Sequence, residues 1–175
     1  PEIMIIKADA NSTRIAGEEW HSDVSCDAEP PLGTILHMHV VPPVGGDTLF
    51  ASMYAAYETL SPPLRGMLEG MTAIHDGEQT YRGRYGQNDD AGRIYPRSEH
   101  PVVVTHPISG KKALYVNRLF TTRIVQLSRR ESDGVLAMLF AHVETPEFQC
   151  RFRWQPGSVA FWDNRCVQHH ALWDY

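Results

Sequence analysis

The stretch Gln149–Trp162, QCRFRWQPGSVAFW, predicts two short strands separated by a turn. Residues 149–154 and 158–162 carry the aromatic and branched residues typical of strands. Between them, Gln155-Pro156-Gly157 places proline and glycine at the positions that a type II turn requires. This stretch therefore predicts a β-hairpin.

Further strands are expected on the N-terminal side of this hairpin. Residues 35–41 alternate apolar residues with His37 and His39. The runs Val102–Val104 and Ala113–Val116 read as strands joined by a turn at residues 108–111.

Helices are expected between these strands. Ser52 caps a short helix that runs through Leu60, and Ser61 before Pro62 begins a second one. Ser128 and Glu131 form a capping box at the start of a longer helix. The chain thus has the pattern of a mostly antiparallel β fold with helical insertions. Residues 72–97 show no period and are expected to form a mobile lid.

The composition indicates a single globular domain. Of 175 residues, 42% are hydrophobic and 21% charged. The net charge is −5 and no apolar run reaches the ~20 residues of a membrane span, so we expect neither a nucleic-acid nor a membrane partner. Cys26, Cys150 and Cys166 form no C-x-x-C pair, which favours a reducing cytoplasm over a disulfide framework.

The pair His21 and Asp23 is a candidate half of a metal site. In an extended segment, residues two apart face the same side and can share one ion. One more histidine would complete the two-histidine, one-carboxylate set typical of Fe(II) oxygenases. Of the adjacent histidines His169 and His170, at most one can join, because neighbouring strand residues face opposite ways. The pair at 37 and 39 resembles a cupin metal motif but lacks its glutamate.

Four motifs occur in order along the chain: WHSD at 20–23, GGDTLF at 45–50, FTTRIV at 120–125, and WDNR at 162–165 followed by Gln168-His169. Together they resemble the taurine dioxygenase family, whose members are Fe(II)- and 2-oxoglutarate-dependent oxygenases. The similarity runs through nearly the whole chain. It implies a double-stranded β-helix, a jelly-roll of two sheets with the iron at its open end.

The resemblance also implies a role for individual residues. His21, Asp23 and His169 match the iron ligands, and His170 would face away. Thr48 matches the threonine whose hydroxyl meets a carboxylate of 2-oxoglutarate.

Three further positions match the surroundings of the iron in the family. Val24 and Phe120 match residues that line the substrate pocket, and Trp162 matches an aromatic residue beside the iron. Arg165, in the WDNR motif, is interpreted as structural.

The chain also departs from the family pattern. The arginine that holds 2-oxoglutarate would lie beyond Tyr175, so residues 1–175 are expected to be a single catalytic jelly-roll domain lacking the family's N-terminal segment and C-terminal arginine strand. Residues 16–19 lack the amide that meets the amine of taurine, and Gly77 replaces a pocket aromatic, which should leave room for a bulkier substrate.

The activity implied by the resemblance is hydroxylation of a small organic anion, a sulfonate or sulfate ester, by dioxygen. 2-Oxoglutarate would be converted to succinate and CO2 in the same reaction. The alternatives are an aryloxyalkanoate or other carboxylate as substrate, a zinc hydrolase with the same three ligands, or a non-catalytic jelly-roll module. A homo-oligomer stays open.

Overall fold

The computed structural model describes residues 3–9, 11–13, 15–83 and 92–175. Its helices and strands follow one another along the chain as β1 Gly33–His37, β2 Thr48–Ser52, α1 Met53–Glu58, α2 Pro62–Leu68, β3 Thr72–Asp76, α3 Glu78–Tyr81, β4 Arg97–Pro101, β5 Val103–Thr105, β6 Lys112–Leu114, β7 Thr121–Ile124, α4 Arg129–Val143, the 3-10 helix η1 Pro146–Phe148, β8 Gln149–Phe152, β9 Val159–Asp163 and β10 Val167–Ala171.

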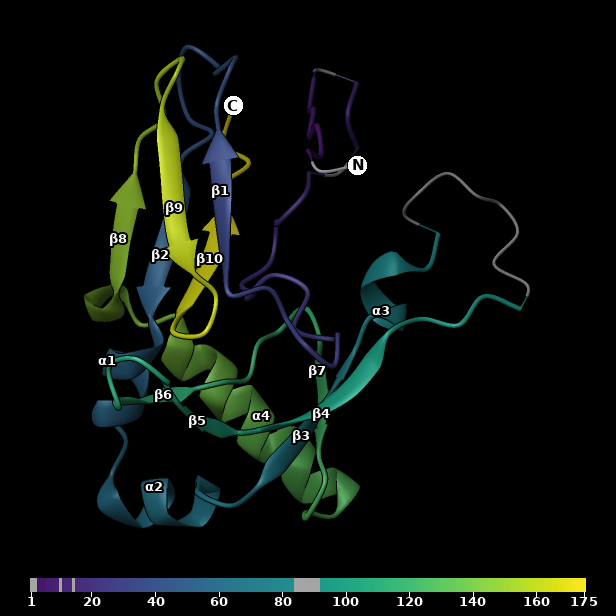
Figure 1. Ribbon diagram of the computed structural model, residues 1–175, viewed down its shortest axis with the longest axis vertical. Coiled ribbons are helices and arrows are strands. Elements are labelled where there is room, and N and C mark those ends of the chain that lie inside the picture. The colour runs from purple at the N-terminus through teal and green to yellow at the C-terminus, as the bar shows by residue number, and fades with distance from the viewer. Residues whose placement is uncertain (1–2, 10, 14, 84–91) are drawn as a thin grey trace.

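Two antiparallel sheets form the upper half of the molecule in Figure 1. One consists of β1 and β9, and the other has the order β10-β2-β8. Phe50 of β2 packs against Trp162 of β9 with ring centroids 5.3 Å apart, so the two sheets face each other. The described strands pair antiparallel, and the mostly β jelly-roll with helical insertions is confirmed.

The lower half combines the helices with two smaller sheets, β4-β3-β7 and β5-β6 (Figure 1). The hydrophobic core lies here, because Leu139 and Val143 of α4 belong to one buried cluster with Ala56 of α1 and Ile124 of β7. The predicted helices after Ser52, Ser61 and Ser128 are confirmed. In the described part of the chain, none of the helices has the length and apolar character needed to cross a membrane.

The predicted hairpin is wrong, although its strands and its turn are present. The amide of Ser158 donates to the carbonyl of Gln155 at 2.9 Å, and Gly157 takes a φ of +84° as a type II turn requires. However, β8 pairs with β2 and β9 pairs with β1. The turn therefore carries the chain from one sheet to the facing sheet instead of closing a hairpin.

The predicted lid over residues 72–97 is also wrong for most of its length. Thr72–Asp76 is the central strand β3 of a sheet, Glu78–Tyr81 is helix α3, and β4 begins at Arg97. The alternation of β3 was hidden because one of its two buried residues is a histidine, His75, and the other is Ala73. The part of the predicted lid at residues 84–91 lies outside the described residues.

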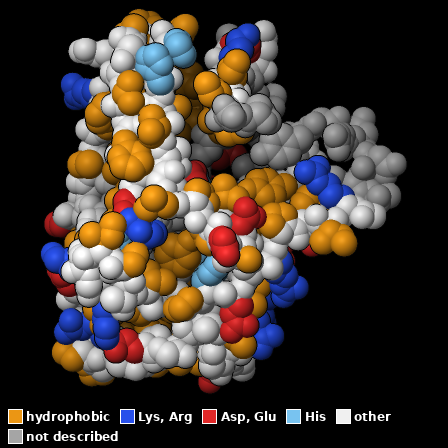
Figure 2. All heavy atoms as spheres, in the orientation of Figure 1, with side chains coloured by type: hydrophobic (Ala, Val, Ile, Leu, Met, Phe, Trp, Pro, Cys, Tyr) orange, Lys and Arg blue, Asp and Glu red, His pale blue; other side chains and the backbone are white. Residues whose placement is uncertain are grey.

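Strand β1 covers residues 33–37 and not 35–41 as expected. β1 ends at His37 because its antiparallel partner β9 begins at Val159, the residue with which His37 pairs. The outer face of β1 and β9 carries apolar side chains, visible in Figure 2, with Ile35 69% and Phe161 67% exposed. Val40, expected on a half-buried strand, is 84% exposed.

The capping box of α4 generates a prediction about stability. The hydroxyl of Ser128 accepts from the amide of Glu131, and the Glu131 carboxylate accepts from the amide of Ser128. Ser128→Ala should lower the free energy of unfolding by about 1 kcal/mol in a urea titration. Ser61→Ala is the matched control, since Ser61 occupies the N-cap of α2 but makes no capping hydrogen bond with its side chain. Equal losses in the two variants would contradict the capping role.

Candidate metal centre

The first and last parts of the chain meet at His21 and His169. The amide of His21 donates to the carbonyl of His169 at 3.1 Å, and the amide of His169 donates back to the carbonyl of His21 at 2.9 Å. This antiparallel bridge joins the loop before β1 to the strand β10. The two imidazole rings lie side by side, with centroids 4.1 Å apart.

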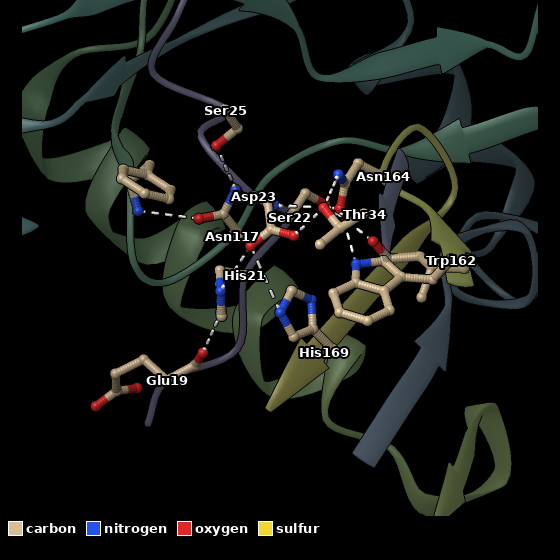
Figure 3. A network of polar contacts seen from close by, with 12 residues as sticks. Glu19, His21, Ser22, Asp23, Ser25, Thr34, Asn117, Trp162, Asn164 and His169 are labelled. Carbon is tan, nitrogen blue, oxygen red and sulfur yellow. Dashed lines mark hydrogen bonds and ion pairs between the residues drawn. The ribbon is translucent and has the colours of Figure 1, made fainter. Parts of the chain in front are cut away.

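The three predicted ligands converge on one point (Figure 3). Oδ1 of Asp23 lies 3.4 Å from Nε2 of His21 and 3.6 Å from Nε2 of His169. One ligand atom from each residue lies within 4.8 Å of the other two. The same-face geometry expected for the H-x-D pair is therefore observed, and His169 completes the set.

Both imidazoles present Nε2 to the Asp23 carboxylate. Nδ1 of His21 lies 2.7 Å from the carbonyl oxygen of Glu19, which only accepts, so Nδ1 is the donor of this hydrogen bond. Burial, together with the neighbouring His21, lowers the pKa of His169 to about 3. A cation bound at Oδ1 of Asp23 would meet Nε2 of each ring.

Asp23 is ionised although it is mostly buried. Burial acts to raise the pKa of Asp23, but the contacts with His21 and His169 and the hydrogen bond from Thr34 outweigh it and lower the pKa to about 2. The hydroxyl of Thr34 donates to Oδ2 at 2.6 Å, which leaves Oδ1 directed at the two histidines.

Thr34 is held in turn by the WDNR motif. Nδ2 of Asn164 donates to the Thr34 hydroxyl at 2.9 Å, and Oδ1 of Asn164 accepts from Nε1 of Trp162 at 3.0 Å. Sequence reasoning missed the roles of Thr34 and Asn164. The signal for Asn164 was its place in WDNR, whereas Thr34 is identified only by the pairing of β1 with β9, which places Thr34 opposite Trp162.

The residue after the carboxylate ligand has a strained backbone. Val24 has a φ of +50°, the only left-handed non-glycine residue in the described part of the chain. For a β-branched residue this conformation is an outlier that costs roughly 1–3 kcal/mol. The surrounding contacts must therefore hold the turn that follows Asp23.

Thr48 lies on the same face of its sheet as His169. Thr48 and Phe50 are two residues apart in β2, and Phe50 pairs directly with His169. Nε1 of Trp154 donates to the buried Thr48 hydroxyl at 2.9 Å, so the hydroxyl hydrogen of Thr48 can be donated elsewhere.

The other candidate histidines lie apart from the site. His170 faces the opposite side of β10 and stacks on Trp20 with centroids 5.5 Å apart. His37 and His39 are exposed, with ring centroids 4.4 Å apart. Among the described residues, neither of them belongs to a group of side chains with metal-ligand spacing.

The predicted pocket residues have different surroundings. Trp162 is buried with its ring 4.7 Å from that of His169. Phe120 is buried against Tyr81, with centroids 5.9 Å apart. The extra room expected at Gly77 is not there, because a Cβ at this position would lie 2.9 Å from ring carbons of Tyr81.

A second cluster, of His106, Asp163 and Cys166, also has metal-ligand spacing. Both carboxylate oxygens of Asp163 are bound by the guanidinium of Arg165, which lowers the pKa of Asp163. Nδ1 of His106 accepts backbone amides, so Nε2 carries the proton and donates to Asp163 at 3.0 Å. The cluster is a saturated hydrogen-bond network, and Arg165 acts structurally in it.

Comparisons with known proteins identify the family of the chain. The family model described as "Taurine catabolism dioxygenase TauD, TfdA family" matches residues 2–175. The "Alpha-ketoglutarate-dependent sulfonate dioxygenase" of Saccharomyces cerevisiae is 41% identical over 89% of this chain and 38% of its own. The "Alpha-ketoglutarate-dependent sulfate ester dioxygenase" of Pseudomonas putida is 39% identical over 89% of this chain and 54% of its own.

The fold agrees as well. A solved taurine dioxygenase from Burkholderia xenovorans superimposes with a TM-score of 0.76 and 39% identity, covering 87% of this chain and 51% of that one. The chain thus spans about half or less of the length of these relatives. Because the family model matches residues 2–175 of the 175, the chain belongs to the TauD, TfdA family of dioxygenases.

Proposed function

We propose that the protein containing this chain is an Fe(II)- and 2-oxoglutarate-dependent dioxygenase that acts on a small organic anion, a sulfonate or sulfate ester. The observation that carries this proposal is the convergence of His21, Asp23 and His169. Residues 1–175 would belong to the catalytic jelly-roll domain of a longer protein, which the lengths of the relatives support.

The donor set fits a divalent iron. Two neutral imidazoles and one carboxylate are the ligands of non-haem Fe(II) oxygenases, and they leave other positions open. His169 Nδ1 is buried without a hydrogen-bond partner in the described part of the chain, so the ring is held by packing against Phe50 and Trp162. When bound, Fe(II) would supply the reduction of dioxygen that is coupled to conversion of 2-oxoglutarate to succinate and CO2.

The chain's own residues bind, orient and exclude water. The ionised Asp23 supplies the single negative charge of the ligand set, and Thr34 fixes its direction. The Thr48 hydroxyl would donate to a carboxylate of 2-oxoglutarate, since Trp154 already occupies its acceptor side. The aromatic rings of Phe50 and Trp162 exclude water beside His169.

The substrate contacts are proposed from Val24 and Phe120. Val24 adjoins the carboxylate ligand in the chain, and Phe120 packs against Tyr81. Hydroxylation of the carbon that bears a sulfonate would give an unstable product that collapses to an aldehyde and sulfite. The names of the yeast and Pseudomonas relatives support a sulfur-containing anion.

We also propose a cytoplasmic location without a nucleic-acid partner. Cys26, Cys150 and Cys166 are free thiols, and the net charge is −5.

The choice between His169 and His170 generates the first functional prediction. His169→Ala should abolish Fe(II) binding by the full-length protein, because it removes one of three ligands. His170→Ala should leave Fe(II) binding within about twofold of the wild type, because that ring stacks on Trp20 outside the site. Equilibrium dialysis under anaerobic conditions measures both, and reversed phenotypes would contradict the assignment.

The substrate class generates a second prediction. Residues 16–19 carry no amide to meet an amine, and a buried ammonium without a partner is costly. Alkyl sulfonates or sulfate esters should therefore support faster succinate release than taurine. Succinate measured across taurine, alkyl sulfonates, alkyl sulfates and aryloxyacetates tests this. Fastest turnover of taurine would refute the argument about the amine, and activity confined to aryloxyacetates would refute the sulfur-containing substrate.

A further inference from the structure

A fully buried hydroxyl lies two residues beyond the carboxylate ligand. Ser25 Oγ is 2.9 Å from Nδ2 of Asn117 and 2.9 Å from Nδ1 of His75. The amide nitrogen of Asn117 donates to the Ser25 hydroxyl, and a second hydrogen bond joins the hydroxyl to Nδ1 of His75. Figure 3 shows Ser25 on the same chain segment as Asp23, joined to Asn117 by a dashed line.

The two partners of Ser25 are themselves immobilised. His75 lies in the central strand β3, is fully buried and stacks on Tyr115 with centroids 5.5 Å apart. Burial lowers the pKa of His75 to about 3, so the ring stays neutral. Oδ1 of Asn117 accepts from the amide of Phe120 at 2.9 Å. Ser25 is therefore tied to two rigid parts of the fold.

The link between Asp23 and Ser25 is the strained residue Val24. A φ of +50° is costly for a valine and persists only where the surrounding contacts hold it. Before Val24, Thr34 binds the Asp23 carboxylate and Asn164 accepts from the Asp23 amide. After it, the Val24 carbonyl accepts from the amide of Asp27 at 3.0 Å, and Ser25 is the residue whose side chain ties this end to the fold. Loss of the Ser25 anchor would let the turn relax and rotate the carboxylate away from the histidines.

We propose that Ser25 is a positioning residue of the metal centre, which keeps Val24 in its left-handed conformation and thereby aims the Asp23 carboxylate at His21 and His169. This inference rests on the proposed function, because it assumes that these three residues bind a metal. Asn117 also accepts from the amide of Phe120, so the same network links the segment that carries Asp23 and Ser25 to the loop before Phe120.

The test compares two deletions of a buried hydroxyl in the full-length protein. Ser25→Ala removes the anchor. Ser132→Ala is the matched control, because Ser132 of α4 is also fully buried and its hydroxyl accepts from the amide of Ile124 at 2.8 Å. Co(II) binding is titrated by its visible absorption, and thermal unfolding is recorded without metal. We expect Ser25→Ala to weaken Co(II) binding about tenfold or more, as loss of a residue that orients a ligand does. Ser132→Ala should bind Co(II) within about twofold of the wild type, although both variants lose thermal stability.

Two further variants separate the possible outcomes. Ser25→Thr keeps the hydroxyl and should restore most of the Co(II) affinity that Ser25→Ala loses. His169→Ala should abolish binding. If Ser25→Ala binds Co(II) as tightly as Ser132→Ala does, the positioning role alone is overturned. A wild-type protein that binds no Co(II), or whose binding survives His169→Ala, would overturn the proposed function and this inference with it.

Discussion

The ionised carboxylate of Asp23 is the interaction on which the rest of the site depends. A carboxylate in a mostly buried position is costly unless partners compensate its charge. Here the compensation comes from Thr34, which binds Oδ2, and from the two histidines that face Oδ1. Burial and the neighbouring His21 lower the pKa of His169 to about 3, so this ring is neutral at neutral pH. A divalent cation bound between the three side chains would complete the arrangement.

The fold brings this cluster together from distant parts of the sequence. The backbone bridge between His21 and His169 closes the loop between the N-terminal segment and β10. The pairing of β1 with β9 then places Thr34 beside Trp162 and Asn164, and the pairing of β2 with β10 places Thr48 on the face of His169. The contacts between these strands are thus a consequence of strand register, and a slip of one residue would turn His169 away and His170 inward.

Much of the site could be predicted from the sequence, because its ligands lie at short spacings or in distinctive motifs. The H-x-D spacing indicated His21 and Asp23, and the resemblance to the family selected His169 over His170. Thr34 was not predicted, since its role follows from a contact 11 residues away in the chain and from Asn164, 130 residues away. Strand β3 was taken for a loop because His75 counts as polar in a periodicity argument although it is fully buried. The QPG turn was identified correctly, but local sequence does not say whether a turn closes a hairpin or crosses between sheets.

The most direct test of the account is a crystal structure of the full-length protein with Mn(II) and a 2-oxoglutarate analogue, with the metal located by anomalous scattering. The account predicts one peak within coordination distance of His21 Nε2, Asp23 Oδ1 and His169 Nε2, and a carboxylate of the analogue hydrogen bonded to Thr48. A peak at His106, Asp163 and Cys166, or a metal that lacks Asp23 as a ligand, would contradict it.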